Sequence, residues 1–439
     1  MQPASSLSLD AQWPDLVAVV SAAIDLEATA RVSGALVRRR AMRSAEMLLR
    51  LALAYGPGGL SLRMAAAWAG ISGLADLSDT AVMKRLRRAA PWLGEVAGAL
   101  LRRAAAVPPT PGPLPGRRLR IADGSMITGP GGAPEWRLHA TYDPVAARLT
   151  GLELTDERGA ESFDRTDWRP GDVALGDRCY ARPPALRRML AAGADFIVRI
   201  GWTRLRLLDA NGAPLAWEWV FGDLAVGETA ERAVSVDYSG EGGKSRGDAV
   251  FPARLIILRL APEAAARAAK AQHRRQNRCR SHRPPQPLTV RATGYLMLVT
   301  SLPAEVSAAE VLEAYRLRWQ VELAFKRLKT VLGLGRPPAK GEALARSWLL
   351  AHLILALLIE DTSRQLLDSL PLPAAAPRRC TSLWRVTQTL RDALLVVIRG
   401  ALSIAALLAA AAILDQRLHE RCHRRRTSQF DEARRHGHA

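Results

Sequence analysis

Hydrophobic residues recur every three or four positions along the first hundred residues, which predicts a helical region over 1–106. One such stretch, 23–56, ends at Gly56, a residue type that commonly terminates helices. The next predicts a short helix over 62–69, a turn from Gly70 to Gly73, and a second helix that starts after Ser78. The region therefore consists of short helices joined by glycine turns.

The second of these helices carries a row of cations, namely Lys84, Arg85, Arg87 and Arg88. A short helix, a glycine turn and a basic helix are typical of helix-turn-helix DNA binding. A plain packing hairpin has the same outline. If the pair is a helix-turn-helix, we expect Lys84, Arg85 and Arg88 to contact DNA.

The pattern changes after a stiff linker, 107–116, which contains five prolines and two glycines. Alternating or short continuous apolar runs predict strands, and one amphipathic run that ends at Gly193 predicts a helix over 183–193. The expected strands of this α/β segment, 117–200, are 117–127, 135–144, 148–157, 194–200 and a short buried strand that starts at 172 and ends at Gly176–Asp177.

Residues 201–303 are mostly strand-like, with a basic loop expected over 270–287. That loop is either solvated and mobile or in contact with a phosphate backbone. After Pro303 the pattern is helical again over 304–338 and 339–439, with a proline-rich break at 370–380.

The charge balance indicates a polyanionic partner. Lys and Arg outnumber Asp and Glu by 62 to 42, a net charge of +20, and a protein this basic usually binds nucleic acid. The cysteines are far apart in sequence, which indicates a reducing cytoplasm and argues against a zinc ribbon; they are Cys179, Cys279, Cys380 and Cys422. His419, Cys422 and His423 fit a solvated basic tail better than a metal site.

Neither end of the chain indicates a membrane protein. Asp10 and Asp15 and the lack of a basic start argue against a signal peptide. The apolar stretch 393–414 is long enough to span a bilayer, but Arg399 interrupts it at a cost of roughly 2.5–3.5 kcal/mol. We expect a buried core or dimer helix there.

Three acids are candidates for the chemistry. Asp123 is expected to end one buried strand and Asp177 another, while Glu322 lies on a predicted helix over 315–334. Either aspartate alone could merely cap a turn. Together, two carboxylates at neighbouring strand ends and a third from a packed helix would bind two Mg²⁺ or Mn²⁺ ions suited to phosphodiester cleavage.

The helix over 315–334 is expected to place Tyr315, Arg318, Glu322 and Lys329 within about 60° of one another. A buried stripe is expected on the opposite side, formed by Leu317, Val321, Ala324, Leu328 and Val331. The polar face is either a solvent face with ion pairs from Glu322 to Arg318 and Lys326, or a row of phosphate-binding cations around a metal-binding carboxylate.

These motifs resemble a known family. The spacing Tyr315-x₂-Arg318-x₃-Glu322-x₆-Lys329 is similar to the YREK signature of DDE-type transposases of bacterial insertion sequences. "IADGS" around Asp123 and "LGDRCYA" around Asp177 resemble the two aspartate motifs of that family, in order and spacing from about residue 60 to residue 335. Cys179 departs from the pattern, because glycine is common there.

The resemblance implies an α/β, RNase H-like core with a β-rich insertion, flanked by helical N-terminal and C-terminal regions. It implies Asp123, Asp177 and Glu322 as ligands of divalent metal, and Tyr315, Arg318 and Lys329 as contacts to phosphates at the transposon end. Trp319 would stack on a nucleotide or pack. It further implies terminal inverted repeats and target DNA as partners, a homodimer in the synaptic complex, and a bacterial cytoplasmic, nucleoid-associated protein.

The expected reaction is hydrolysis at each transposon end followed by attack of the freed 3′-hydroxyl on target DNA. A hairpin intermediate is compatible with this group. Two alternatives stay open from the sequence: an RNase H-like nuclease or resolvase without strand transfer, and a DNA-binding regulator that has lost catalysis.

Overall fold

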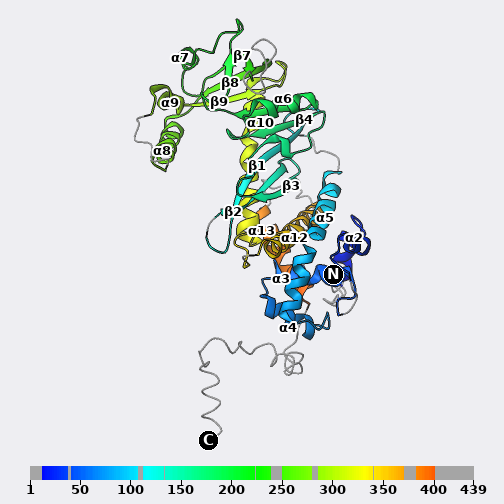
Figure 1. The fold of residues 1–439 in the computed structure, drawn as a ribbon. Coiled ribbons are helices and arrows are strands. Elements are labelled where there is room, and N and C mark those ends of the chain that lie inside the picture. The colour runs from blue at the N-terminus through cyan, green and yellow to red at the C-terminus, as the bar shows by residue number, and fades with distance from the viewer. Residues whose placement is uncertain are drawn as a thin grey trace, which may run out of the picture. The chain divides into compact units, whose positions relative to one another are not determined.

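A mixed sheet of nine strands organises the middle of the chain, in the order β3-β2-β1-β4-β5-β9-β8-β7-β6 (Figure 1). The computed structural model describes residues 12–37, 41–106, 112–132, 134–222, 224–238, 250–278, 285–339, 341–369 and 382–400. The strands are β1 (Arg118–Thr128), β2 (Pro134–Asp143), β3 (Arg148–Asp156), β4 (Asp172–Gly176), β5 (Asp195–Arg199), β6 (Arg206–Leu208), β7 (Thr229–Asp237), β8 (Val250–Arg259) and β9 (Tyr295–Thr300).

The first five strands have the RNase H-like arrangement. β1 pairs antiparallel with β2, and β2 with β3, whereas β1, β4 and β5 run parallel. β4 is short and buried along its whole length, as expected of a strand covered on both faces. The predicted fold class, and each strand expected between 117 and 200, are confirmed, with small shifts at the strand ends.

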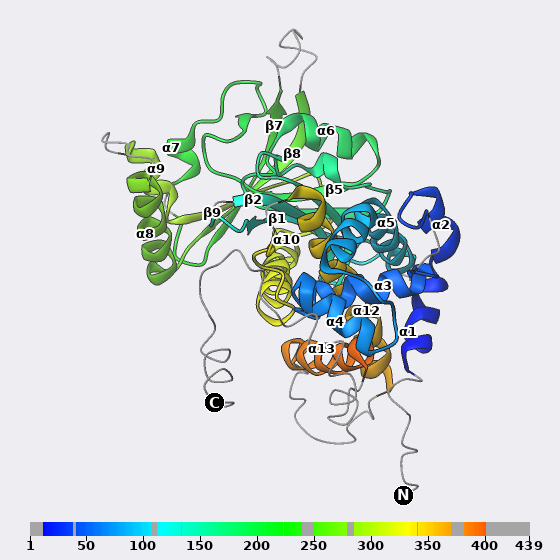
Figure 2. The same cartoon turned by 60° about the horizontal axis from the view of Figure 1, so that its bottom comes forward.

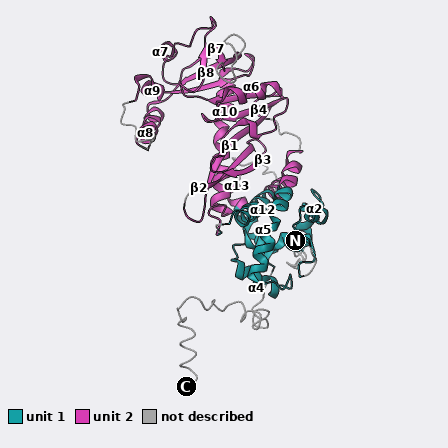
Figure 3. Ribbon diagram, viewed as in Figure 1, with its two compact units in different colours: residues 1–97, 339–359, 388–439 teal, residues 98–338, 360–387 magenta. Residues whose placement is uncertain are grey.

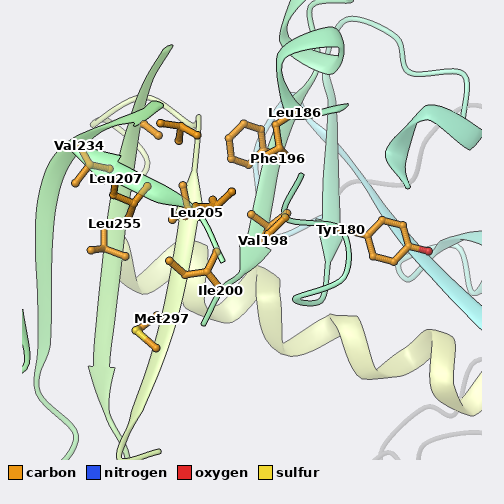
Figure 4. Packing of buried hydrophobic residues seen from close by; sticks show 14 of the residues in the cluster. Tyr180, Leu186, Phe196, Val198, Ile200, Leu205, Leu207, Val234, Leu255 and Met297 are labelled. Atoms are coloured by element: carbon orange, nitrogen blue, oxygen red, sulfur yellow. The ribbon is translucent and has the colours of Figure 1, made fainter. Parts of the chain in front are cut away.

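The β-rich insertion extends the same sheet. It leaves β5 and returns through β9, which pairs antiparallel with β5, while β8, β7 and β6 follow outward. Side chains from β5 (Phe196, Val198) and from the insertion (Leu207, Leu255, Met297) belong to one buried hydrophobic cluster (Figure 4). The insertion is therefore packed into the core and is not a separate layer.

The insertion also contains helices that the sequence pattern did not predict: α7 (Trp217–Val220), α8 (Pro262–Arg278) and α9 (Pro287–Ala292). The expected basic loop over 270–287 is wrong for its first part, since residues 270–278 belong to α8. Pro262 and Glu263 in the first turn, followed by a run of alanines, favour a helix strongly enough to extend it through the basic residues. Residues 279–284 lie outside the described residues.

The chain forms two compact units, coloured separately in Figure 3. Residues 98–338 and 360–387 make the unit that contains the sheet, and 1–97, 339–359 and 388–439 make the helical unit. The remaining helices are α1 (Gln12–Ser21), α2 (Leu26–Val32), α3 (Ala45–Tyr55), α4 (Leu62–Ile71), α5 (Asp79–Ala105), α6 (Pro183–Ala191), α10 (Ala308–Arg316), α11 (Gln320–Lys326), α12 (Glu342–Ser369) and α13 (Leu383–Arg399).

Within the helical unit two predicted helix boundaries are found, whereas α4 continues to Ile71, past its predicted end at residue 69. The helix α3 ends at Tyr55, before Gly56, and the Ser78 hydroxyl accepts a hydrogen bond from the Ala81 N–H at the start of α5, as an N-cap does. The end of α13 lies against α3 and α4 (Figure 2), since Arg50 donates to the Ile398 carbonyl and Trp68 to that of Arg399, at 2.8 and 2.9 Å. N-terminal and C-terminal segments therefore share one core.

The apolar stretch 393–414 is not one helix where the structure describes it. The helix α13 ends at Arg399, and Gly400 has a φ of 70°, which does not continue a helix. Residues 401–414 lie outside the described residues. Among the described helices, α12 alone is long and apolar enough to cross a membrane, but 83% of its most apolar window is buried, as in the core helix of a water-soluble domain.

Candidate active site

Asp123 and Asp177 stand at the same level of the sheet. The parallel pairing of β1 with β4 ends at Ile121 opposite Leu175, and each aspartate lies two residues beyond that pair. Side chains two residues apart point to the same face of a strand, and neighbouring strands are about 4.8 Å apart. The strand register therefore brings two carboxylates together that are far apart in sequence.

One aspartate reaches this place as expected and the other does not. Asp177 follows the last residue of β4, and its carboxylate accepts a hydrogen bond from the Cys179 N–H at 2.7 Å, which starts the turn. Asp123, however, does not end its strand. β1 continues to Thr128 because β2 keeps pairing with it after β4 has stopped. Asp123 therefore sits on a continuous strand with a rigid backbone.

A pocket of about 470 Å³ opens at this point and also receives Glu322 from α11. Its lining residues are Asp123, Gly124, Ser125, Asp177, Arg318, Glu322, Phe325, Lys326, Lys329 and Thr330. The three predicted acids thus line one cavity, together with the arginine and the lysine of the signature.

Arg318 connects two of the acids. Its guanidinium group lies 3.8 Å from the Asp123 carboxylate and forms a short hydrogen-bonded ion pair with Glu322, whose side chain is 56% exposed. The expected ion pair of Glu322 with Arg318 is confirmed.

The charges of the pocket act most strongly on Asp123. The pKa of Asp123 is raised to about 7, chiefly by burial; the Gly124 N–H and Arg318 act to lower it, and the Asp177 and Glu161 carboxylates act to raise it. A buried carboxylate that is destabilised by neighbouring acids gains from a bound cation. Such a shift is characteristic of functional sites.

The helix over 315–334 is not a regular α-helix, and this corrects the expected face. The segment runs as α10, a 3₁₀ turn (Leu317–Trp319), α11 and a π-helical turn (Arg327–Val331). Changes of helical pitch like these often mark functional positions. The buried stripe is confirmed at Val321, Ala324, Leu328 and Val331, and Leu317 is only partly buried.

The residues of the expected polar face consequently differ in exposure. Tyr315 is buried, 8% exposed, and burial raises its pKa to about 12. Its hydroxyl has no hydrogen-bond partner among the described residues. Lys329 is partly buried and its ammonium group donates to the Met126 carbonyl at 2.7 Å. Trp319 is exposed and does not line the pocket.

The three cations predicted in the helical unit lie on α5, where Lys84 and Arg88 are exposed and Arg85 is partly buried. Burial lowers the pKa of Arg85, and Arg88 lowers it further. These residues form a basic surface of that unit. No described contact gives them a role in the pocket.

The sequence analysis missed one acid of the site. Glu161, on the loop after β3, has a carboxylate oxygen within 4.8 Å of ligand atoms of both Asp177 and Cys179. No periodic pattern or strand end points to this loop residue. Only the way the loop folds over β1 brings Glu161 next to the aspartates.

The pocket fits a hard divalent cation. Its acidic ligands are carboxylate oxygens, the donor type that Mg²⁺ and Mn²⁺ prefer, and they converge from two strands and a helix. The opening to solvent leaves room for a phosphate group beside the carboxylates.

Gly176 is expected to be indispensable for placing Asp177. A Cβ atom at Gly176 would lie 2.7 Å from the Phe163 ring and 2.7 Å from the Tyr180 Cβ, so Gly176→Ala should destabilise the fold by about 1–3 kcal/mol. Chemical denaturation measures this change. The control is Gly201→Ala, because a Cβ there meets nothing within 4 Å. Equal stability of the two variants would contradict the prediction.

Comparisons with known proteins agree with this geometry. The family model described as "Transposase DDE domain" matches residues 115–358, more than half of the chain. The chain is 44% identical over 370 residues to the putative transposase InsL for insertion sequence element IS186A of Escherichia coli (strain K12), covering 84% of this chain and 98% of that one. It is 43% identical over 371 residues to the transposase for insertion sequence element IS421 of Escherichia coli, with the same coverage.

A weaker likeness is found among solved structures. The piggyBac transposase, in a synaptic complex with hairpin DNA, superposes with a TM-score of 0.46 and 10% identity, covering 98% of this chain and 89% of that one. The match of the family model and the extent of identity to the two insertion-sequence proteins carry the assignment. The chain belongs to the DDE transposases of bacterial insertion sequences.

Proposed function

We propose that Asp123, Asp177 and Glu322 hold two Mg²⁺ or Mn²⁺ ions, and that this site both cuts the transposon ends and joins them to target DNA. The enzyme is a transposase that acts on DNA and depends on divalent metal. The observation that carries the assignment is the register of β1 and β4, which aligns the two aspartates in the pocket that Glu322 also lines.

The metal ions would activate the attacking oxygen and stabilise the leaving oxygen of an in-line phosphoryl transfer. The chain's own residues position these groups. Asp123 is fixed by the sheet and Asp177 by the turn that follows β4, so their carboxylates need little reorganisation. Glu322 is more exposed and is held by Arg318, so it is the ligand that can move when a cation or DNA enters.

Arg318 and Lys329 would bind the phosphates next to the scissile bond. Both line the pocket, and each is held by a partner that a phosphate can replace or supplement: the acids for Arg318 and the Met126 carbonyl for Lys329. Burial lowers the pKa of Lys329, so a phosphate that stabilises its charge would bind it favourably. Tyr315 would support Arg318 from the buried side, and Trp319 remains available for stacking on a nucleotide.

The helical unit would supply further DNA contacts. We assign to α4 and α5, with Lys84, Arg85 and Arg88, the binding of the terminal inverted repeat, and to a homodimer the pairing of two transposon ends. A bacterial cytoplasm, at the nucleoid, is the compartment in which this substrate occurs.

The proposed reaction is tested with linear DNA that carries the sequences flanking the reading frame, plus a target plasmid. The purified protein with Mg²⁺ is expected to release 3′-hydroxyl ends and to join them to the plasmid. Cutting without joining would favour the nuclease alternative, and binding without either product would favour a catalytically inactive regulator.

Lys329→Ala is expected to weaken binding to transposon-end DNA and to DNA of unrelated sequence by the same factor. The slope of log affinity against log salt concentration is expected to become less steep by about one. Binding measured by fluorescence anisotropy over a range of salt concentrations tests this. The control is Arg316→Ala: Arg316 is exposed, pairs with Glu313 and does not line the pocket. An unchanged salt slope in Lys329→Ala would remove Lys329 from the phosphate-binding residues.

A further inference from the structure

Glu161 is distant in sequence from Asp123 and Glu322 but lies beside the aspartates in the structure. The carboxylate oxygens of Glu161 and Asp177 and the Cys179 sulfur all lie within 4.8 Å of one another. At Gly124, next to Asp123, an added Cβ would be 2.6 Å from a Glu161 carboxylate oxygen. The Glu161 side chain therefore lies directly over the backbone of β1, and a larger residue at position 124 would have to displace it.

The loop that carries Glu161 is anchored on both sides. Before it, the Ala160 carbonyl accepts a hydrogen bond from Arg165 at 2.6 Å. After it, Phe163 is fully buried, and its carbonyl accepts a hydrogen bond from the Trp168 ring at 2.7 Å. Glu161 is thus placed by packed structure and not by chance on a surface loop. A ligand group needs such support to be held in position.

A buried polar group without a partner among the described residues lies within electrostatic reach of Asp177, although it does not line the pocket. Tyr315 is 8% exposed, its hydroxyl has no hydrogen-bond partner among the described residues, and Asp177 is one of the charges that act on it. A buried hydroxyl without a partner costs free energy unless a bound group satisfies it. The ligand sphere of a cation at Asp177 would offer such a partner.

We propose that Glu161 is a fourth carboxylate of the active site and that, together with Asp177, it binds a divalent cation. The inference rests on the metal site proposed above. Asp177 then shares cations with Asp123 and Glu322 on one side and with Glu161 on the other. Arg137, whose guanidinium group is 3.7 Å from Glu161, partly neutralises this carboxylate without a cation.

The probe is Mn²⁺ alone, titrated into the full chain without DNA and followed by electron paramagnetic resonance of the free ion. Glu161→Gln, which removes one charge and keeps the side-chain shape, is expected to weaken Mn²⁺ binding at least about tenfold. The control is Glu157→Gln, which removes the same charge from the same loop region at an exposed residue that pairs with Arg158. The control is expected to bind Mn²⁺ as the unchanged protein does.

Asp177→Asn separates the two proposals. If Asp177→Asn loses Mn²⁺ binding and Glu161→Gln keeps it, the inference about Glu161 is wrong while the metal site stands. If Asp177→Asn also binds Mn²⁺ normally, the proposed metal site itself is wrong. Melting in EDTA reports whether each variant is folded. If Glu161→Gln is not, Glu161→Ala, which also removes the carboxylate, is used, and a Mn²⁺ affinity equal to that of the unchanged protein would overturn the inference.

Discussion

Asp123→Asn is expected to abolish both DNA cleavage and strand joining, with a loss of at least about three orders of magnitude in rate. The substitution keeps the size of the side chain but removes a carboxylate that no neighbour can replace, because the rigid strand fixes its position. Loss of metal-assisted charge stabilisation is worth several kcal/mol, and about 4 kcal/mol corresponds to a factor of about 10³. Single-turnover cleavage of transposon-end DNA measures the effect.

The same variant should not be unstable. An acid whose pKa is raised in the folded state destabilises the fold when it is ionised. For Asp123 the free energy of unfolding should therefore fall as the pH increases from about 3.8, the ordinary pKa, to about 7, the raised pKa. At pH 8 without metal, Asp123→Asn should therefore melt at the same temperature as the unchanged protein or higher. If Asp123→Asn melts at a lower temperature than the unchanged protein, its loss of activity reflects instability. The activity test then no longer supports Asp123 as a metal ligand.

Glu322→Gln is the second large effect and decides which acid completes the site. If Glu322 is the third ligand of the metal pair, cleavage and joining fall by about 10³, as for Asp123→Asn. The matched control is Glu313→Gln on α10, where the acid is 60% exposed and pairs with Arg316 outside the pocket. Rates with transposon-end DNA compare the two.

The result for Glu322 must be read beside that for Glu161. Glu322 is paired with Arg318 and exposed, whereas Glu161 is one of the charges that raise the pKa of Asp123. Should Glu322→Gln keep its rate while Glu161→Gln loses it, Glu161 would be the third acid, and the glutamate of the YREK signature would serve only to hold Arg318.

The predicted helix face holds for Arg318, Glu322 and Lys329, which line one pocket, and is wrong for Tyr315, which is buried. The error at Tyr315 has a physical reason. A periodicity of 3.6 residues assumes one continuous α-helix, but the segment changes pitch twice, at Leu317–Trp319 and at Arg327–Val331. Each change rotates the following residues. Tyr315 therefore points into the protein while Glu322 points into the pocket.

The basic residues of α8 were predicted to form a loop, and this prediction is wrong for a different reason. Their charge and the prolines that follow them indicated a loop, yet a run of alanines behind Pro262 was sufficient to continue the helix to Arg278. Local propensity decided that segment, and it was present in the sequence.

The sequence by itself determined the strands of the core, the helical regions on either side and the identity of two aspartates and a glutamate, because these depend on local periodicity and on motifs a few residues long. Only the tertiary structure decided that the insertion extends the same sheet, that Asp123 lies on an unbroken strand and that Glu161 reaches Asp177 over Gly124. Such contacts depend on which strand ends first and which loop packs on which backbone. Packing sets these between distant segments, and no local pattern records them.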